Sequence, residues 1–288
     1  MSFQFIASQM MVGLINGSFY AVLSLGLALI FGMLHIVNFA HGAFYMLGAI
    51  FAWLLLTKLG IGYWWALLLS PAIVGLIGIL IQRLLLQRLA NEDPIYGLLL
   101  TFGLTLMIQS FVQANYGSAG LPYNIPKLLS GGWELGSVFL PIYRVWIIGI
   151  SIVACFTIWY AIERTRLGSY LRATTEDQEL VLAFGINVPL LVGLTFGAGA
   201  ALAGFAGVLA APIYSVSPQM GVELLAIVFA VVVIGGMGSI VGVIVSGYGM
   251  GLIEGVAKVF YPEASSTIIF AFMILILSLR PQGLFGKY

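Results

Sequence analysis

The 288-residue sequence has very few charged side chains: Lys and Arg together number 11, Asp and Glu 10, and His 2. A soluble domain is normally about one quarter charged. The 7% found here, with 61% hydrophobic residues, therefore excludes a soluble globular protein and indicates an integral membrane protein with lipid as a partner. The net charge of +1 gives no indication of nucleic-acid binding. The first charged side chain is Lys58, so the N-terminal apolar stretch lacks the basic region of a signal peptide and is expected to remain as a span.

Cysteine and the common catalytic motifs are also scarce. Cys155 is the only cysteine and lies in an apolar run, which excludes disulfides within the chain and thiolate metal sites. No G-x-x-x-x-G-K-[ST] sequence occurs, because the terminal GLFGKY has neither the spacing nor a following Ser or Thr. No G-x-S-x-G occurs either, which disfavours an intramembrane hydrolase. We therefore expect no enzyme activity and no cofactor, with any ATP bound by a different chain.

Hydropathy predicts an all-α, polytopic transmembrane bundle of about eight spans in a single domain, residues 1–288, because each span needs about 20 apolar residues. The apolar blocks lie near 5–34, 42–57, 63–81, 95–112, 145–162, 189–210, 224–257 and 264–279. Block 42–57 is short, and block 224–257 is too long for one span and is interrupted by GGMGS. We expect the long block to dip into the membrane and return, as a half-helix to about Ile234 and a full helix from about Ile240.

Basic residues predict the orientation, because Lys and Arg remain on the cytoplasmic side during insertion. If the N-terminus is outside, seven basic residues fall on the inner face and four on the outer face. The inner set is Arg83, Arg88, Arg164, Arg166, Arg172, Arg280 and Lys287, and the outer set is Lys58, Lys127, Arg144 and Lys258. This bias places the loop 163–188 and the C-terminus in the cytoplasm.

The cytoplasmic loop 163–188 is the most charged part of the chain. Residues 163–179 hold seven of the 21 charged side chains, which indicates a meeting place with a soluble partner. Thr174 or Thr175 is a suitable N-cap, and Gly185 is a natural stop before the next span opens at Pro189. The pattern predicts a short amphipathic helix with an apolar face of Leu180, Val181, Ala183 and Phe184. Such a helix is either a solvated connector or a surface that docks into a groove on another subunit.

Four blocks of sequence carry a resemblance to a known family. They are LHIVNFAHGAFYMLGA (34–49), RTRLGSYLRATTEDQELVLAFGINV (164–188), VIGGMGSIVGVIVSG (233–247) and RPQGLFGK (280–287). In this order they resemble the branched-chain amino acid ABC transporter permeases. The early GLINGSFYAVLSLGLALIFG and the compact length are more similar to the LivH-like subunit than to the longer LivM-like one.

The resemblance implies a bacterial inner-membrane importer with four kinds of partner or subunit. They are this permease, a second LivM-like permease, two cytoplasmic ATP-binding subunits and a periplasmic substrate-binding protein. It also implies that the loop 163–188 is the coupling region that receives ATPase movement. The residues assigned to coupling are Arg164, Arg166, Gly168, Arg172, Glu176, Leu180, Phe184 and Gly185.

Two polar interruptions, HIVNFAHG (35–42) and IGGMGSIVG (234–242), predict the solute path, because broken helices in transporters expose backbone N–H and C=O groups near the binding site. The expected path residues are Asn16, Tyr20, His35, Asn38, His41, Gly235, Gly236, Gly238 and Ser239. Simple helix packing remains an alternative for GGMGS. For His35 and His41, hydrogen bonds between helices are favoured over a metal, since no carboxylate or cysteine accompanies them.

Further polar groups at membrane depth, Gln109, Gln113, Glu223 and Glu254, must face protein or water. Glu254 and Lys258 are four residues apart, which predicts an ion pair on one helix. On the outer side, loop 114–144 is expected to form a hairpin or lid. It is either a landing surface for the binding protein, through Lys127, Glu134 and Arg144, or an interfacial belt of Trp and Tyr.

The expected function is therefore ATP-driven import of branched-chain amino acids, or of related small amino acids or carboxylates, by alternating access. The alternative is a channel or secondary transporter that works without an ATPase. The resemblance leaves the solute open, since it extends to importers of amides, urea and aromatic acids, and selectivity can reside in the external binding protein.

Overall fold

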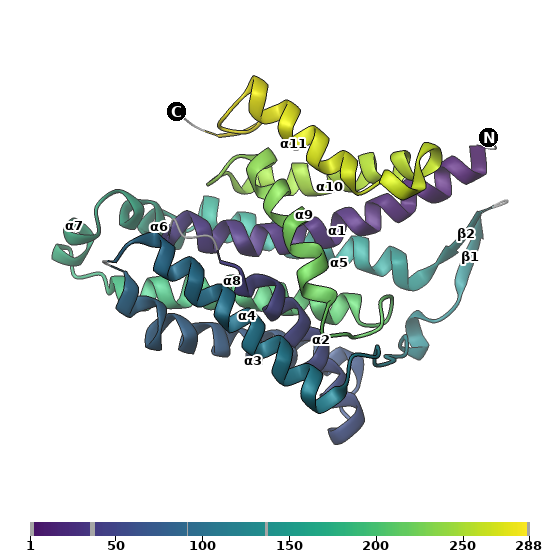
Figure 1. Cartoon of the computed structure of the whole chain (residues 1–288), viewed down its shortest axis with the longest axis horizontal. Coiled ribbons are helices and arrows are strands. Elements are labelled where there is room, and N and C mark those ends of the chain that lie inside the picture. The colour runs from purple at the N-terminus through teal and green to yellow at the C-terminus, as the bar shows by residue number, and fades with distance from the viewer. Residues whose placement is uncertain (1–2, 35–37, 91, 136–137, 287–288) are drawn as a thin grey trace. The chain divides into compact units, whose positions relative to one another are not determined.

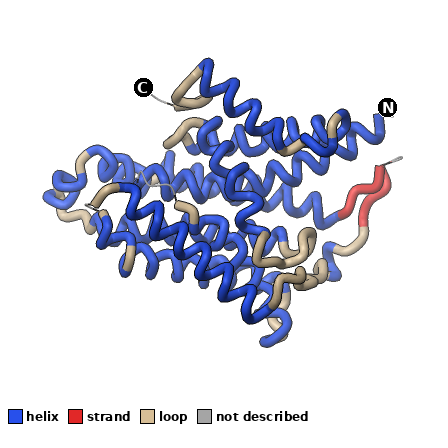
Figure 2. The backbone as a smooth tube through the Cα atoms, viewed as in Figure 1, coloured by secondary structure: helices blue, strands red, loops and turns tan. Residues whose placement is uncertain are grey.

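The computed structural model describes residues 3–34, 38–90, 92–135 and 138–286, and most of them are helical (Figures 1 and 2). The helices are α1 (Phe3–Leu34), α2 (Ala40–Leu59), α3 (Tyr63–Leu84), α4 (Pro94–Tyr116), α5 (Ile142–Arg164), α6 (Arg166–Glu176), α7 (Gln178–Ala183), α8 (Val188–Ala210), α9 (Met220–Gly235), α10 (Ile240–Phe260) and α11 (Thr267–Leu279). Short 3-10 helices lie at Leu86–Leu89, Lys127–Leu129 and Pro262–Ala264. Strands β1 (Gly132–Leu135) and β2 (Val138–Pro141) pair in one antiparallel hairpin.

Seven of the described helices are long and apolar enough to cross a membrane: α1, α2, α3, α4, α5, α8 and α10. Two more apolar helices are shorter, α9 with 16 residues and α11 with 13. At a rise of 1.5 Å per residue these two span about 24 and 20 Å, less than the hydrocarbon core of about 30 Å. The prediction of an all-α polytopic bundle is confirmed, and the chain is a multi-pass membrane protein.

The two irregular apolar blocks have different outcomes. Block 42–57 is part of a full-length helix, because α2 begins at Ala40 and has 20 residues, so the expectation of a short span is wrong. The predicted break in the long block is confirmed, since α9 ends at Gly235 and α10 begins at Ile240, whereas the dip into the membrane stays a prediction. Between them Gly236 and Gly238 have φ of 98° and 92°, a left-handed backbone that favours glycine and ends the helix.

The chain divides into two compact units, each assembled from separated segments. The first unit comprises Met1–Leu25, Asn124–Phe156 and Ala226–Tyr288. The second comprises Gly26–Tyr123 and Thr157–Leu225. The boundaries fall inside α1, α5 and α9, so each of these helices contributes residues to both units.

The first unit is built on an antiparallel contact between α1 and α10. Small residues recur every four positions on both helices, as Gly13, Gly17 and Ala21 on α1 and Gly247, Gly251 and Gly255 on α10. A Cβ atom at Gly13 would lie 2.5 Å from the Gly251 carbonyl oxygen, and one at Gly247 would lie 2.6 Å from Ala21 Cα. The two backbones are therefore in direct contact, which replaces the hydrophobic driving force that is absent between helices in lipid.

The second unit is centred on α8, which packs against α2 and α3. A Cβ atom at Gly78 of α3 would lie 2.6 Å from Ala200 Cβ, and one at Gly48 of α2 would overlap the Gly204 backbone. The Ser70 hydroxyl of α3 donates to the Gly48 carbonyl at 2.6 Å, which satisfies its polar group inside the bundle. This close packing around α8 gives the loop 163–188, which leads into α8, a rigid base.

Candidate functional site

The loop 163–188 contains two helices, α6 and α7, and not the single short helix expected (Figure 1). The α6 helix folds back on the end of α5 at Thr165. Gly168 has no room for a side chain there, because a Cβ atom would overlap the Ile162 carbonyl. Arg172 reinforces the fold, since its Nη1 donates to the Ile162 carbonyl at 3.3 Å and lies 3.9 Å from Glu163 Oε2.

Asp177, and neither Thr174 nor Thr175, caps α7. The Asp177 carboxylate accepts a hydrogen bond from the Leu180 backbone N–H at 2.9 Å. Both threonine hydroxyls instead donate back to carbonyls inside α6, those of Tyr170 and Arg172. The predicted N-cap is therefore wrong by two or three residues, because three residues able to cap a helix compete within four positions. Gly185 follows α7 with φ of 79°, which confirms it as the stop.

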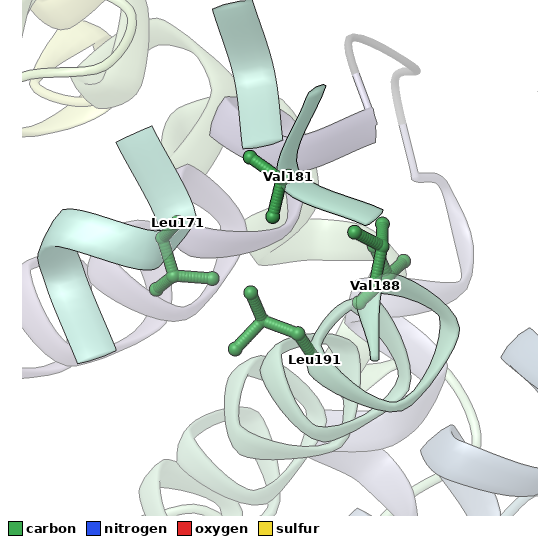
Figure 3. Packing of buried hydrophobic residues seen from close by; sticks show 5 residues of the cluster. Leu171, Val181, Val188 and Leu191 are labelled. Carbon is green, nitrogen blue, oxygen red and sulfur yellow. The ribbon is translucent and has the colours of Figure 1, made fainter. Parts of the chain in front are cut away.

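A small apolar core joins α6 and α7 to the start of α8. It consists of Leu171, Val181, Val188, Leu191 and Val192, all buried. Figure 3 shows Leu171, Val181, Val188 and Leu191 gathered around one point from these three elements. Burial of a side chain of this size contributes about 1.5–3 kcal/mol. These packed side chains fix α7 to the start of α8.

The apolar residues of α7 point in two directions. Val181 enters the core, whereas Leu180, Leu182 and Phe184 are exposed, with 54%, 50% and 77% of their surface accessible. The prediction of one apolar face with Val181 beside Leu180 and Phe184 is therefore corrected. We refer to Leu180, Leu182 and Phe184 as the coupling face. Arg164, Arg166, Arg172 and Glu176 are exposed in the helices that precede it.

One of the polar groups predicted at membrane depth, Glu254, meets Asn16 and Tyr20 in the first unit. Glu254 of α10 is 4% exposed, and its carboxylate accepts hydrogen bonds from Tyr20 OH at 2.7 Å and Asn16 Nδ2 at 3.2 Å. Lys258 Nζ lies 2.7 Å from its other oxygen, which confirms the predicted ion pair. From the sequence, Asn16 and Tyr20 were predicted to line the solute path, and they were not linked to Glu254. Their spacing of four on one face of α1 was the available signal.

The glycine-rich break between α9 and α10 is supported by the C-terminal segment 280–286. The Leu284 N–H donates to the Ile234 carbonyl at 2.8 Å, and the Phe285 N–H donates to the Gly235 carbonyl at 3.2 Å. These bonds satisfy carbonyl groups that the end of a helix leaves unpaired. A Cβ atom at Gly236 would lie 2.5 Å from the Gly286 nitrogen. Sequence reasoning missed this docking, because backbone bonds have no side-chain signature.

Ser239 opens the helix that follows the same break. Its hydroxyl accepts from the Gly242 N–H at 3.1 Å, which makes it the N-cap of α10. Gly235 approaches Gly242 so closely that a Cβ atom there would lie 2.7 Å from the Gly242 carbonyl carbon. Close packing, the alternative considered for GGMGS, therefore holds at Gly235, whereas Gly238 has open space around it.

The earlier polar interruption lies at the start of α2, in the second unit. Asn38 and His41 are both buried. The Asn38 side-chain oxygen accepts from the Ala40 N–H at 3.0 Å, and the Phe39 N–H donates to Thr101 Oγ1 of α4 at 3.2 Å. The His41 ring lies against α1, since a Cβ atom at Gly26 would be 3.0 Å from its Cε1. His35 lies outside the described residues, so the pair of histidines is not described.

The loop between α4 and α5 contains the hairpin that was one of its two expected forms, made by β1 and β2. Lys127 and Glu134 are exposed on it. Nearby in sequence, burial raises the pKa of Tyr123 to about 12, with a smaller contribution from Tyr63. In the second unit the Leu121 N–H donates to the Val216 carbonyl at 2.8 Å, which anchors the start of the loop to the segment after α8.

An apolar groove of about 770 Å³ lies between α10 and α11. Leu252, Val256, Phe260 and Phe272 are among its lining residues, and no predicted path residue lines it. Among the described residues, no group of three or more His, Cys, Asp or Glu side chains is placed to hold a metal ion.

Comparison with known proteins gives matches along nearly the whole chain. The family model described as branched-chain amino acid transport system / permease component matches residues 9–277. The chain is 30% identical over 303 residues to the high-affinity branched-chain amino acid transport system permease protein LivH of Escherichia coli (strain K12), covering 99% of this chain and 97% of LivH. It is 31% identical over 294 residues to BraD of Pseudomonas aeruginosa, covering 97% and 95%.

The chain is also similar to the high-affinity branched-chain amino acid transport system permease protein LivM of Escherichia coli (strain K12). The identity is 28% over 291 residues, which covers 92% of this chain and 67% of LivM. The match to LivH thus covers more of both chains, as the compact length suggested. No solved structure matches the chain significantly.

Proposed function

The chain belongs to the family of branched-chain amino acid transport system permease components, and from this premise we propose that it is the LivH-like permease subunit of an ATP-driven importer. The importer moves branched-chain amino acids, or related small amino acids or carboxylates, across the bacterial inner membrane. The substrate class follows from the relatives, which are permease proteins of high-affinity branched-chain amino acid transport systems.

The energy source is assigned to partner chains. The sequence contains no phosphate-binding G-x-x-x-x-G-K-[ST] loop, so ATP must be bound elsewhere. Similarity to both LivH and LivM supports a complex with a second, LivM-like permease. Two cytoplasmic ATP-binding subunits and a periplasmic substrate-binding protein complete the proposed importer.

The observation that carries the proposal is the coupling face on α7. Three large apolar side chains are exposed on a loop rich in charge, while the same helix is fixed to α8 by Val181 in the apolar core. Exposed apolar side chains rimmed by polar ones mark a protein interface. We assign this face to a groove on the ATP-binding subunit, so that closure of that subunit on ATP pushes α7 and, through the core, α8.

The solute path is assigned to the two breaks in the helices. In the second unit these are Asn38 and His41 at the start of α2, and in the first unit the turn from Gly235 to Ser239. Both sites place buried polar side chains or bent backbone at the end of a helix, which is the arrangement that transporters with broken helices use at their binding sites. His35 is proposed with them on its sequence position alone.

Purification of the tagged chain from its native host, followed by mass spectrometry and reconstitution, tests this function. The expected result is recovery of a second permease and two ATP-binding subunits, and ATP-dependent leucine uptake once loaded binding protein is added. Competition by isoleucine and valine, and not by short amides or urea, would fix the substrate class. Uptake by the isolated chain without ATP would replace the importer with a channel or secondary transporter.

A further inference from the structure

The Glu254 carboxylate is a buried charge with three donors, and it lies between α1 and α10. Lys258 belongs to the same helix as Glu254, and its Nζ lies 2.7 Å from one carboxylate oxygen. Asn16 and Tyr20 belong to α1, and Asn16 Nδ2 and Tyr20 OH lie 3.2 and 2.7 Å from the other oxygen. An ionised side chain at membrane depth is costly unless it is paired and hydrogen-bonded. Here both carboxylate oxygens are engaged, so the interaction holds together two segments more than 230 residues apart.

The cluster lies within the close backbone contact between α1 and α10 in the first unit. A Cβ atom at Gly17 would lie 3.0 Å from Tyr248 Cα, and one at Gly255 would lie 2.8 Å from Gly13 Cα. These contacts occupy the same stretch of α1 and α10 as the four polar side chains. A solute could reach the Glu254 carboxylate only if the two helices separated and gave up this packing.

A second polar contact extends the assembly to α5. The Tyr248 hydroxyl of α10 lies 2.6 Å from Ser151 Oγ of α5. Both residues belong to the same compact unit as the Glu254 cluster. Polar contacts between helices in lipid specify one register, since glycine packing alone would allow one helix to slide along the other.

We propose that Glu254 is a positioning residue of the permease, which fixes the register of α1 against α10 so that the two helices move as one body during transport. Asn16 and Tyr20 then hydrogen-bond to the carboxylate, Lys258 pairs with it, and none of the three contacts solute. This inference rests on the proposed transport function, and it reassigns two residues that the sequence placed on the solute path.

Uptake kinetics of charge variants in the reconstituted complex test the role. E254Q leaves the Lys258 ammonium without its partner, and we expect the maximal rate of uptake to fall about tenfold or more, with the half-saturating concentration of loaded binding protein unchanged. The double variant E254Q/K258Q removes both charges and should recover the maximal rate to within about threefold of wild type. A raised half-saturating concentration without recovery in the double variant would make Glu254 a solute contact and overturn the proposal.

A distance measurement tests rigidity directly and does not depend on the E254Q variant folding well. Met10 and Val256 are exposed and stand next to Gln9 and Gly255, whose backbones touch. Spin labels at M10C and V256C, in a C155A background that removes the buried native thiol, report the spacing of α1 and α10. We expect the same distance distribution without nucleotide and with ATP bound. A distribution that shifts between these states would contradict movement as one body.

The two tests separate failure of this inference from failure of the proposed function. If wild-type complex shows no ATP-dependent uptake, the importer assignment fails, whatever the variants do. If wild type transports and E254Q transports equally well, only the positioning role of Glu254 fails.

Discussion

The coupling loop and the contact between α1 and α10 use opposite arrangements of side chains. On α7, large apolar residues are exposed, with Phe184 77% accessible, although the loop is the most charged part of the chain. Between α1 and α10, the carboxylate of Glu254 is buried in an apolar helix pair and is fully engaged. The first arrangement exposes apolar side chains, and the second buries polar side chains in an interface between two helices of the chain.

This contrast separates two roles in one transporter. An exposed apolar face contributes favourable free energy only when a partner covers it, so its stabilising effect appears in the assembled complex. A buried ion pair has already been desolvated, so breaking it lowers the stability of the chain itself. Variants in the coupling face should therefore affect coupling more than stability, whereas variants that break the packing between α1 and α10 should also lower the stability of the chain.

The largest effect is expected at Gly251, where α10 touches the α1 backbone. Gly251→Leu forces the helices apart, because a side chain there meets Gly17, and overpacking of this kind costs about 3 kcal/mol or more. The amount of chain in the membrane and the melting temperature of the purified complex should both fall. Gly249→Leu is the matched control, since no atom lies within 4 Å of a Cβ at that position. Equal losses in both variants would contradict direct helix contact.

The second-largest effect is expected from Gly168→Ala, which should lower uptake without lowering the amount of chain in the membrane. A methyl group at this position would overlap the Ile162 carbonyl, so α6 must shift away from α5, and the coupling face would shift with it. We expect uptake to fall about tenfold, because small displacements of positioning groups have effects of this size or greater. Gly149→Ala on the open side of α5 is the control and should transport normally. Normal uptake by Gly168→Ala would show that the position of α6 does not matter.

Val181 and Phe184, three residues apart, sharpen the comparison within one helix. Val181→Ser places a hydroxyl in the apolar core and should lower the free energy of unfolding by about 2 kcal/mol. Phe184→Ser changes an exposed residue, so the melting temperature should stay within about 1 °C while uptake falls several-fold. Thermal unfolding and uptake measured on the same preparations check both. A stability loss in Phe184→Ser and none in Val181→Ser would invert the assigned faces.

The smallest effect is expected at the cap of α7. Asp177→Ala removes the acceptor for the Leu180 N–H and should cost about 1 kcal/mol of local helix stability, seen as faster backbone hydrogen exchange in α7. Thr175→Ala, at a position that the sequence favoured equally, should leave exchange in α7 unchanged. The reverse pattern would restore a threonine as the cap.

Local signals in the sequence predicted more of this molecule than long-range contacts. The break after Gly235 was predictable because glycine is needed where φ is positive, and the Glu254 and Lys258 pair because four residues make one turn of a helix. The partner of Asn16 was not, since helix periodicity says which face a residue occupies and not which helix meets it. The docking of Leu284 on α9 was missed because backbone hydrogen bonds have no side-chain signature, and the cap was misplaced because Thr174, Thr175 and Asp177 are all able to cap a helix.

The most direct test of the account is uptake and ATP hydrolysis by the complex carrying Leu180→Pro. Proline at this position removes the N–H that bonds Asp177 and disrupts α7, while the spans are untouched. Gln178→Pro is the control, because the first position of a helix accepts proline and Asp177 before it is already extended, at φ −152° and ψ 100°. We expect normal membrane insertion in both variants, with ATP-driven uptake lost only in Leu180→Pro. Normal uptake by Leu180→Pro would contradict the assignment of α7 as the coupling helix.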